Sequence, residues 1–456
     1  MSCFINLSNK IMPQIKSGIS HSMRNIKTGY FKGFSRVAIA ERTAEAAPPQ
    51  WIYFERYVNG IQPRPNNPLA TYSELEPQYR PNSSADSFQV PNFQIPKKNV
   101  MVLCSSDINP KIFNHYLSNE HASLAVHPQI SKDLSVNKMQ EIVSHPKASD
   151  IVVSPTASSR TVFVLDPHLP PHCLKLHCPI QITRSTRHLE KRKIEHSITV
   201  SNALAHSTAM RANPAFAYFP ESLGIVYGNA FDSWGFLVRD MTPRPYLPNS
   251  SFIPLFSLYS PDVAHPNRPP LLHELIGESG VDPEQCILQQ IFFPLLKCWV
   301  DVYTNTGILL EAHGQNVCLE LSESGQISRF IFRDFDTYVN KDIYTEKHKG
   351  SLEGLNPYEL FQSKDTEEAP QGTTVSLIYD QAMRVPFDRI AEIAEKTYHI
   401  PKQRLQSACR SYLRQIFPEG DLHFPKGGKV FNYAEGALRV GAKAKIVETG
   451  QEPTWR

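Results

Sequence analysis

The feature that most constrains the fold is a predicted β-hairpin with polar side chains at its open end. Residues 316–322 and 327–335 alternate polar and apolar side chains, and the sequence ESGQ between them supplies a turn. A turn centred near Gly325 would place Asn316 opposite Asp334, with Cβ atoms about 5 Å apart. Such oxygen ligands suit Mg²⁺, which proteins usually hold with one or two carboxylates plus substrate phosphates. The hairpin mouth is therefore a candidate metal or phosphate site, and the alternative is a polar loop end that faces water.

Length and composition indicate a folded protein of enzyme size. A chain of 456 residues is long enough for two or three domains that each bury a core. The net charge of +3 is too small to indicate a nucleic acid or membrane partner. No apolar run approaches the roughly 18 residues that a membrane span needs. The eight cysteines show no disulfide-framework spacing, so we expect a cytoplasmic protein.

Strand and helix signals fill most of the chain. Residues 41–100 are rich in Pro, Asn and Ser and predict loop. We predict strands over 99–106, 150–165 and 175–183, a hairpin over 225–240, and helices over 189–207, 283–308, 385–397 and 402–416. Pro294 is expected to kink its helix. The Pro-rich stretch 243–270 marks a candidate domain boundary.

Polar motifs also precede the hairpin. In chain order the motifs are SPTASSRT (154–161), KLHCPIQIT (175–183), EAHGQN (311–316) and RDF (333–335). Arg187 follows Lys175 by twelve residues. This order resembles the siderophore synthetases that work without a peptide-synthetase assembly line, the aerobactin-synthetase (IucA/IucC) type. The resemblance runs from about Trp51 to the end of the hairpin, and more faintly to the C-terminus.

The resemblance implies an α+β fold in a cupped-hand thumb, fingers and palm arrangement, with mixed and antiparallel sheets flanked by helices. Residues 1–50 would be a poorly defined basic N-terminus, 51–265 a shortened thumb plus fingers domain, and 266–456 the palm domain with the hairpin. Family members normally place a longer helical region before the segment that matches Trp51–Gly60. Residues 1–40 carry six Lys or Arg and no acidic residue, so an organelle transit peptide is the alternative to a shortened start.

The activity implied by the resemblance is ATP-dependent carboxylate activation. A citrate-like polycarboxylate would attack the α-phosphate of ATP, pyrophosphate would leave, and an amine, hydroxylamine or amino alcohol would capture the acyl-adenylate and release AMP. Two anions approach each other in this reaction, so fixed positive charge and Mg²⁺ are needed. ATP would lie between fingers and palm, since ligands often bind at domain interfaces.

Site residues follow from the same resemblance, motif by motif. The implied ATP contacts are Ser158, Ser159, Arg160, Lys175, Arg187, His313 and Asn316. Catalytic roles fall on Arg160, Lys175 and His313, and the metal-side positions are Glu311, Gln315 and Asp334. Arginine and lysine suit a phosphate clamp, because a guanidinium binds phosphate oxygens in pairs and an ammonium acts as a point charge. The alternative for Arg187 is a solvated position in a basic run.

The acid side departs from the family pattern. Family members carry histidines where this chain has Ile61 and Arg64, and those histidines help bind the carboxylate substrate. Arg64 could still pair with a carboxylate. Thr156 and His127 are further candidates for substrate contact, although His127 could equally be a structural histidine. We therefore expect nucleotide binding to be intact and citrate activation to be weak or absent.

Two other functions remain open from the sequence. HGQN followed by Asp334 and Asp336 is similar to the pattern of aminoglycoside and choline kinases, which predicts a small-molecule phosphotransferase. Gln315 then stands where such a kinase needs a carboxylate base. The second possibility is a degenerate paralogue that binds nucleotide without turnover. The reaction products distinguish the three functions: a synthetase releases AMP and pyrophosphate, a phosphotransferase releases ADP, and a degenerate paralogue releases neither. We expect a homodimer with no nucleic-acid or membrane partner.

Overall fold

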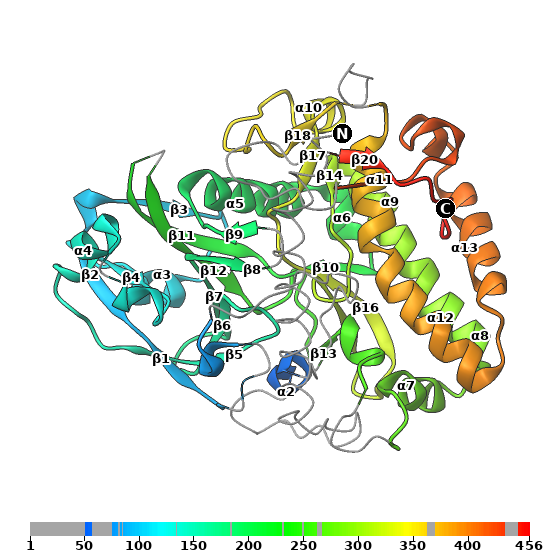
Figure 1. Ribbon diagram of the computed structural model, residues 1–456, viewed down its shortest axis with the longest axis horizontal. Helices are drawn as coiled ribbons and strands as arrows, with labels where there is room; N and C mark the ends of the chain where they lie inside the picture. The colour runs from blue at the N-terminus through cyan, green and yellow to red at the C-terminus, as the bar shows by residue number, and fades with distance from the viewer. Residues whose placement is uncertain are drawn as a thin grey trace, which may run out of the picture.

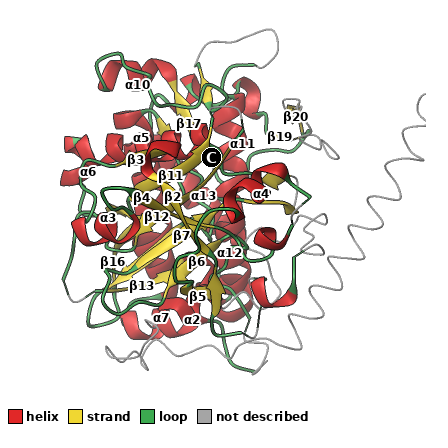
Figure 2. Cartoon of the chain, turned by 90° about the vertical axis from the view of Figure 1, so that its left-hand side faces the viewer, coloured by secondary structure: helices red, strands yellow, loops and turns green. Residues whose placement is uncertain are grey.

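A computed structural model describes residues 51–56, 75–80, 83, 85–133, 135–182, 185–229, 232–248, 250–261, 267–362, 370–433 and 446–456. The basic N-terminus and the acid-side segment with Ile61 and Arg64 lie outside these residues. Mixed helices with antiparallel and mixed sheets confirm the predicted α+β class (Figures 1 and 2).

The largest sheet has seven antiparallel strands. Their order is β1 (Phe88–Val90), β5 (Ile151–Pro155), β6 (Thr161–Val164), β7 (His172–Leu176), β12 (Ser233–Asp240), β11 (Glu221–Gly228) and β3 (Val100–Cys104). Helix α5 (Lys191–His206) packs on β11 and β12. Gly224 and Gly235 permit this close approach, because a Cβ at either position would meet Ile194 at 2.1 or 2.7 Å. The other face packs against β2 (Asn92–Pro96) and β4 (His121–Ala125).

The predicted hairpin lies in a second sheet of four strands. Their order is β10 (Phe216–Tyr218), β16 (Ile327–Phe332), β15 (Val317–Leu321) and β13 (Ser251–Pro254). β10 is parallel to β16, and the other two pairings are antiparallel. A third sheet contains β14 (Ile308–Leu309), β17 (Tyr338–Asn340) and β18 (Leu360–Phe361). β10 and β13 precede residue 265, so strands from both sides of the candidate boundary build the hairpin sheet.

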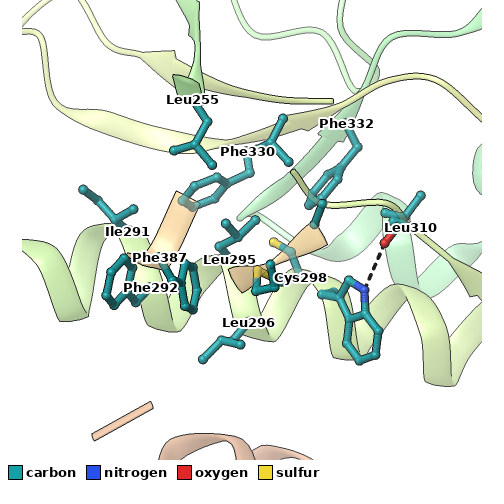
Figure 3. Packing of buried hydrophobic residues seen from close by; sticks show 14 of the residues in the cluster. Leu255, Ile291, Phe292, Leu295, Leu296, Cys298, Leu310, Phe330, Phe332 and Phe387 are labelled. Atoms are coloured by element: carbon teal, nitrogen blue, oxygen red, sulfur yellow. Dashed lines mark hydrogen bonds between the residues drawn. The ribbon is translucent and has the colours of Figure 1, made fainter. Parts of the chain in front are cut away.

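Helices gather on the side of the hairpin sheet away from the seven-stranded sheet (Figure 1). They are α7 (Leu271–Ser279), α8 (Pro283–Gln285), a π-helix (Cys286–Phe292), α9 (Phe293–Thr306), α11 (Thr373–Ala382), α12 (Arg384–Tyr398) and α13 (Lys402–Ile416). Figure 3 shows Leu295 and Cys298 of α9 packed beneath Phe330 and Phe332 of the hairpin. The Trp299 indole donates a hydrogen bond of 3.1 Å to the Leu310 carbonyl and so fixes the chain just before Glu311.

The remaining elements are shorter. The helices are α2 (Trp51–Arg56), α3 (Pro110–Tyr116), α4 (Asn137–Val143), α6 (Thr208–Ala212) and α10 (Lys341–Lys347). The strands are β8 (Cys178–Ile182), β9 (Ser185–Arg187), β19 (Phe431–Tyr433) and β20 (Ile446–Glu448). Within the described residues, no helix is long and apolar enough to cross a membrane.

The predicted elements agree with the structure in most places. The helix over 402–416 is confirmed residue for residue, and the hairpin over 225–240 is confirmed as β11 and β12. The single strand expected over 175–183 is wrong: the chain forms β7 and β8 with a break at His177. The helix expected over 283–308 is interrupted, because π-helical turns precede Pro294, whose missing N–H favours the start of a new α-helical segment.

Candidate active site

The hairpin register differs by one residue from the prediction. The N–H of Gly325, at φ 80°, donates to the Ser322 carbonyl in the turn. Just before the turn, β15 has a register shift between Glu320 and Leu321. Asn316 therefore lies opposite Arg333, whose N–H donates to the Asn316 carbonyl at 3.0 Å. The expected pairing of Asn316 with Asp334 is wrong. Asp334 leaves the sheet with φ 71°, a left-handed conformation that Asp tolerates better than most residues.

Lys175 and Asp334 connect the two large sheets. Lys175 lies on β7 with its side chain 2% exposed, and Asp334 directly follows Arg333 beyond β16. Lys175 Nζ donates to Asp334 Oδ1 at 2.5 Å. Burial alone would raise the pKa of the Asp334 carboxyl, but Lys175 and the more distant Arg239 outweigh it and hold that pKa well below its usual range. Sequence motifs 159 residues apart thus meet at one ion pair.

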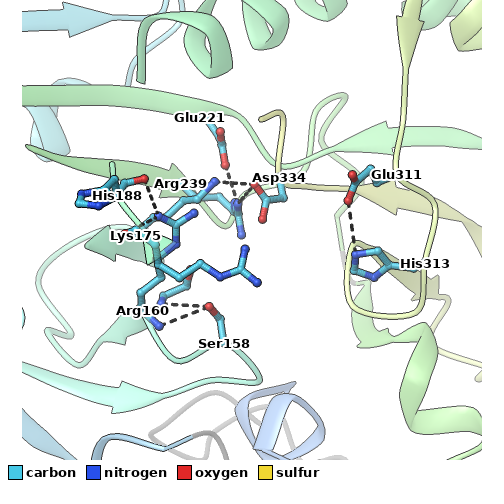
Figure 4. Close-up of polar contacts among 11 residues, drawn as sticks. Ser158, Arg160, Lys175, His188, Glu221, Arg239, Glu311, His313 and Asp334 are labelled. Atoms are coloured by element: carbon cyan, nitrogen blue, oxygen red, sulfur yellow. Dashed lines mark hydrogen bonds and ion pairs between the residues drawn. The ribbon is translucent and has the colours of Figure 1, made fainter. Parts of the chain in front are cut away.

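Arg239 and Glu221 complete this charged group and were missed by the sequence analysis. Arg239 Nη2 lies 2.5 Å from Glu221 Oε1 and 3.9 Å from Asp334 Oδ1. Figure 4 shows the side chains of Arg239, Lys175 and Arg160 gathered on one side of Asp334, with Glu311 and His313 on the other. Both missed residues are charged groups inside otherwise apolar strand sequences, ESLGIVYG and SWGFLVRD, and that pattern could have identified them.

The loop between β5 and β6 is held by its own side chains. Thr156 Oγ1 donates to the Thr161 carbonyl at 2.6 Å and accepts from the Ser158 N–H at 3.1 Å. Ser158 Oγ accepts from the N–H groups of Arg160 and Thr161 at 3.4 and 3.3 Å. Thr156 and Ser158 therefore support this loop, and their hydroxyl groups set the position of Arg160.

Arg160 is anchored on the segment that contains Arg187. Its Nη1 donates to the carbonyls of Arg187 and His188 at 3.2 and 3.3 Å. These bonds use one edge of the guanidinium, and they bring together two of the predicted ATP contacts. Ser159 is also buried in this loop. The structure thus places Ser158, Ser159, Arg160 and Arg187 in one region.

A second buried ion pair fastens the hairpin to α2. Arg333 Nη1 lies 2.5 Å from Glu55 Oε1, and Arg333 Nε donates to the Gln315 carbonyl at 2.8 Å. Glu55 Oε2 also accepts from the Ala157 N–H at 3.3 Å, while Gln315 Nε2 donates to the Ala157 carbonyl at 3.0 Å. Gln315 therefore links the hairpin to the β5–β6 loop, and only its amide oxygen remains available for a metal.

His313 and Glu311 lie on the side of Asp334 away from Lys175, Arg160 and Arg239 (Figure 4). His313 Nδ1 accepts from the Gln315 N–H at 3.1 Å, so a neutral ring carries its proton on Nε2. That nitrogen lies 3.9 Å from Glu311 Oε2. Gly314 is required here, because a Cβ would meet the Tyr259 hydroxyl at 2.0 Å. Asn316 follows at the start of β15 and is largely buried.

His127 is fully buried and lies next to the loop between β5 and β6, where the Ser159 backbone acts to raise its pKa. Its Nδ1 accepts from the Gln129 N–H at 3.3 Å, and its Nε2 has no hydrogen-bond partner among the described residues. Burial lowers the pKa of His127 to about 4, so the ring is neutral at physiological pH. The ring packs edge-on against Tyr79 with centroids 5.3 Å apart. Contact of His127 with a substrate stays a prediction.

The donor set fits a magnesium ion held jointly with phosphates. The described residues contain no cluster of three or more His, Cys, Asp or Glu side chains. Mg²⁺ does not need one, because it keeps several waters and takes one or two protein carboxylates plus substrate oxygens. Asp334 is 36% exposed and Glu311 28%, so both carboxylates can reach such an ion.

Comparison with known proteins finds similarity to one family of synthetases in part of the chain. Residues 78–260 match the model of the IucA / IucC family, and solved structures share the fold over most of the chain. Residues 288–428 also match the model described as ferric iron reductase FhuF-like transporter.

A curated relative from Staphylococcus aureus, L-2,3-diaminopropanoate–citrate ligase, is 30% identical over 212 residues. That match covers 43% of this chain and 35% of the relative, so it spans about a third of the relative's length.

Solved structures share the fold of this chain at low identity. Aerobactin synthetase IucC from Klebsiella pneumoniae gives a TM-score of 0.67 at 15% identity, over 90% of this chain and 77% of that chain. ATP-bound aerobactin synthetase IucA from the same species gives a TM-score of 0.66 at 14% identity, over 94% of this chain and 81% of that chain. The petrobactin biosynthesis protein AsbB from Bacillus anthracis gives a TM-score of 0.66 at 14% identity, over 92% of this chain and 76% of that chain.

Proposed function

We propose that this protein is an ATP-dependent synthetase of siderophore biosynthesis. It adenylates a citrate-like polycarboxylate and joins it to an amine, hydroxylamine or amino alcohol, with release of AMP and pyrophosphate. The observation that carries the proposal is the Lys175–Asp334 ion pair, where the SPTASSRT, KLHCPIQIT and RDF motifs converge between two sheets. A relative named a citrate ligase and a solved relative named as ATP-bound support it.

Lys175 is proposed to exchange its partner when ATP binds. Its ammonium is almost fully buried and donates to Asp334. A phosphate oxygen would replace that carboxylate as the acceptor, and Asp334 would then be free to turn toward Mg²⁺. Bound Mg²⁺ would supply charge stabilisation at the phosphates. Glu311 and Asp334 would hold it from opposite sides of the site, with the Gln315 amide oxygen as a further candidate.

Arg160 and His313 are proposed to act on the α-phosphate. Arg160 is held by two backbone carbonyls, so the rest of its guanidinium is oriented before the ligand arrives. His313 presents an Nε2–H, because its Nδ1 accepts from the backbone. Both groups would donate hydrogen bonds to phosphate oxygens as the carboxylate attacks. The negative charge that develops on those oxygens would therefore lie next to donors that are oriented in advance. Asn316, Ser158, Ser159 and Arg187 would complete the nucleotide contacts.

The acid would bind near the segment that contains Ile61 and Arg64. We propose that Arg64 supplies the strong carboxylate contact there and that Ile61 removes one donor, which weakens citrate activation. The phosphotransferase alternative is not favoured, since the family model and the solved relatives are synthetases. A homodimer and a cytoplasmic location remain predictions that size-exclusion chromatography and cell fractionation can test.

Product analysis tests the proposal. The full chain is incubated with ATP, Mg²⁺ and citrate, 2-oxoglutarate or succinate, with and without diamines. We expect AMP and pyrophosphate in equal amounts, with faster release when a suitable acid is present. Lys175→Met provides the inactive control. Release of ADP and a phosphorylated product would refute the synthetase assignment, and absence of any turnover with every acid would favour the degenerate paralogue.

A further inference from the structure

Helix α5 starts with three consecutive cations, and the third, Lys193, differs from the other two in its ion pairing. Lys191 lies 3.9 Å from Glu195, and Arg192 lies 3.2 Å from Glu190. Arg192 also stacks over the Tyr358 ring at 4.7 Å. Lys193 is half-buried, yet no carboxylate of the described part of the chain forms an ion pair with it. A buried ammonium without a partner is costly, and the roles proposed above do not use it.

The packing of α5 fixes the direction of the Lys193 side chain. Ile194 sits directly on the sheet at Gly224 and Gly235. His196 Nε2 donates to the Thr337 carbonyl at 2.7 Å, and its Nδ1 accepts from the Asn356 N–H at 3.0 Å. Residues three apart share a helix face, so Lys193 points toward the segment that runs from Asp334 to Thr337.

The surroundings of Lys193 contain cations of the phosphate site and one incompletely bonded acid. Burial lowers the pKa of the Lys193 amine. Asp336 opposes this shift, while Arg160 and Lys175 add to it. Asp336 Oδ1 is buried and has no hydrogen-bond partner among the described residues. Burial alone would raise the pKa of Asp336, but Lys193 and Lys175 hold it below its usual value. The Arg160 guanidinium donates to the His188 carbonyl three residues before α5 begins, so Lys193 lies close to the phosphate-site cations along the chain and can offer its ammonium to the same anionic ligand.

We propose that Lys193 binds the two phosphates of ATP that leave as pyrophosphate. This inference rests on the proposed function and assigns a residue to one end of the nucleotide. During adenylation a carboxylate oxygen bonds to the α-phosphorus, and the bond from that phosphorus to the bridging oxygen breaks. Pyrophosphate leaves with the electron pair. The growing negative charge on it is what a fixed, compact ammonium stabilises.

The chain offers a matched pair of variants for the test. Lys193→Met keeps the length of the side chain and removes the charge, and Lys191→Met does the same two residues away on the same turn. Titration calorimetry on the full chain would use ATP, pyrophosphate and AMP, each with Mg²⁺. We expect Lys193→Met to weaken ATP and pyrophosphate binding by about ten- to a hundredfold, the usual effect of one charge-assisted hydrogen bond. AMP binding should change less than about twofold, and Lys191→Met should behave as wild type.

Thermal unfolding of the ligand-free variants separates binding from a structural role. Lys193→Met removes the cost of a partly buried charge but also a cation near Asp336, so the melting temperature should change little. A marked fall in melting temperature, unchanged ATP and pyrophosphate affinity, or an equal loss for AMP would each overturn the inference. If the wild type itself binds no ATP, the proposed function fails. If the wild type makes AMP and Lys193→Met matches it in every titration, only the assignment of Lys193 fails.

Discussion

Removing the Arg239 guanidinium should destabilise the protein by about 3–5 kcal/mol, the typical cost of leaving a buried charge unpaired. The Glu221 side chain is 0% exposed, the Arg239 side chain is 5% exposed, and their charged atoms lie 2.5 Å apart. Glu221 Oε2 has no other partner among the described residues. In Arg239→Met the Glu221 carboxylate therefore keeps its desolvation cost and loses the cation that forms an ion pair with it.

A double-mutant cycle isolates this interaction. Arg239→Met and Glu221→Met would each be measured alone and together by urea-induced unfolding with one spectroscopic probe. Because buried ion pairs can often be replaced by apolar side chains of similar size, the double variant should recover most of the loss and give a coupling of about 2–4 kcal/mol. A value for Arg239→Met within about 1 kcal/mol of wild type, or a double variant no more stable than the worse single one, would contradict the reasoning.

Other variants test the remaining assignments. Arg160→Ala should weaken ATP binding by about 1.5–3 kcal/mol in titration calorimetry, and unchanged affinity would assign Arg160 to structure alone. Asp334→Ala should abolish Mg²⁺-dependent turnover without unfolding the chain, and near-wild-type activity would refute the metal-side role. Restoring the family's histidines with paired Ile61→His and Arg64→His should increase citrate-dependent pyrophosphate release, because two donors would then contact the acid, and a fall in release would contradict this assignment. The pKa of Asp334 is lower in the folded state, so its stabilising effect is present above pH of about 4 and is lost as pH falls. Asp334→Asn should therefore lose less stability than the wild type as the pH falls below about 4, measured by thermal unfolding at each pH, and an equal loss would contradict the argument.

Local patterns predicted elements well where packing and sequence agree. The α13 helix was predicted residue for residue, because its apolar positions recur at helical spacing and Pro401 stands just before its start. The hairpin strands were also identified from their alternation. Their register was not, because the bulge at Glu320 and the left-handed Gly325 shift the pairing by one residue without changing which segments alternate.

The charge partners in the site depend on long-range packing. Lys175 was assigned to a strand from its neighbours, but nothing local indicated that Asp334 would lie against it. Glu55 meets Arg333 only because α2 packs on β13 next to the hairpin. Motif order indicated which residues share the site, and three-dimensional packing decides which of them touch.

Three cations of the site, Lys175, Arg239 and Arg333, form ion pairs with carboxylates. Arg239 is paired with Glu221 and Arg333 with Glu55, and all four side chains are buried. Lys175 is paired with Asp334, and Asp334 alone among these carboxylates is substantially exposed. Phosphate can therefore compete for Lys175 at a lower desolvation cost than for either arginine. If phosphate replaced Asp334, as proposed, the released carboxylate would be available to hold Mg²⁺. Each ligand would then increase the affinity of the site for the other by the same factor, because coupling between two binding events is reciprocal. The Lys175–Asp334 pair is thus the element through which nucleotide and metal binding would be linked.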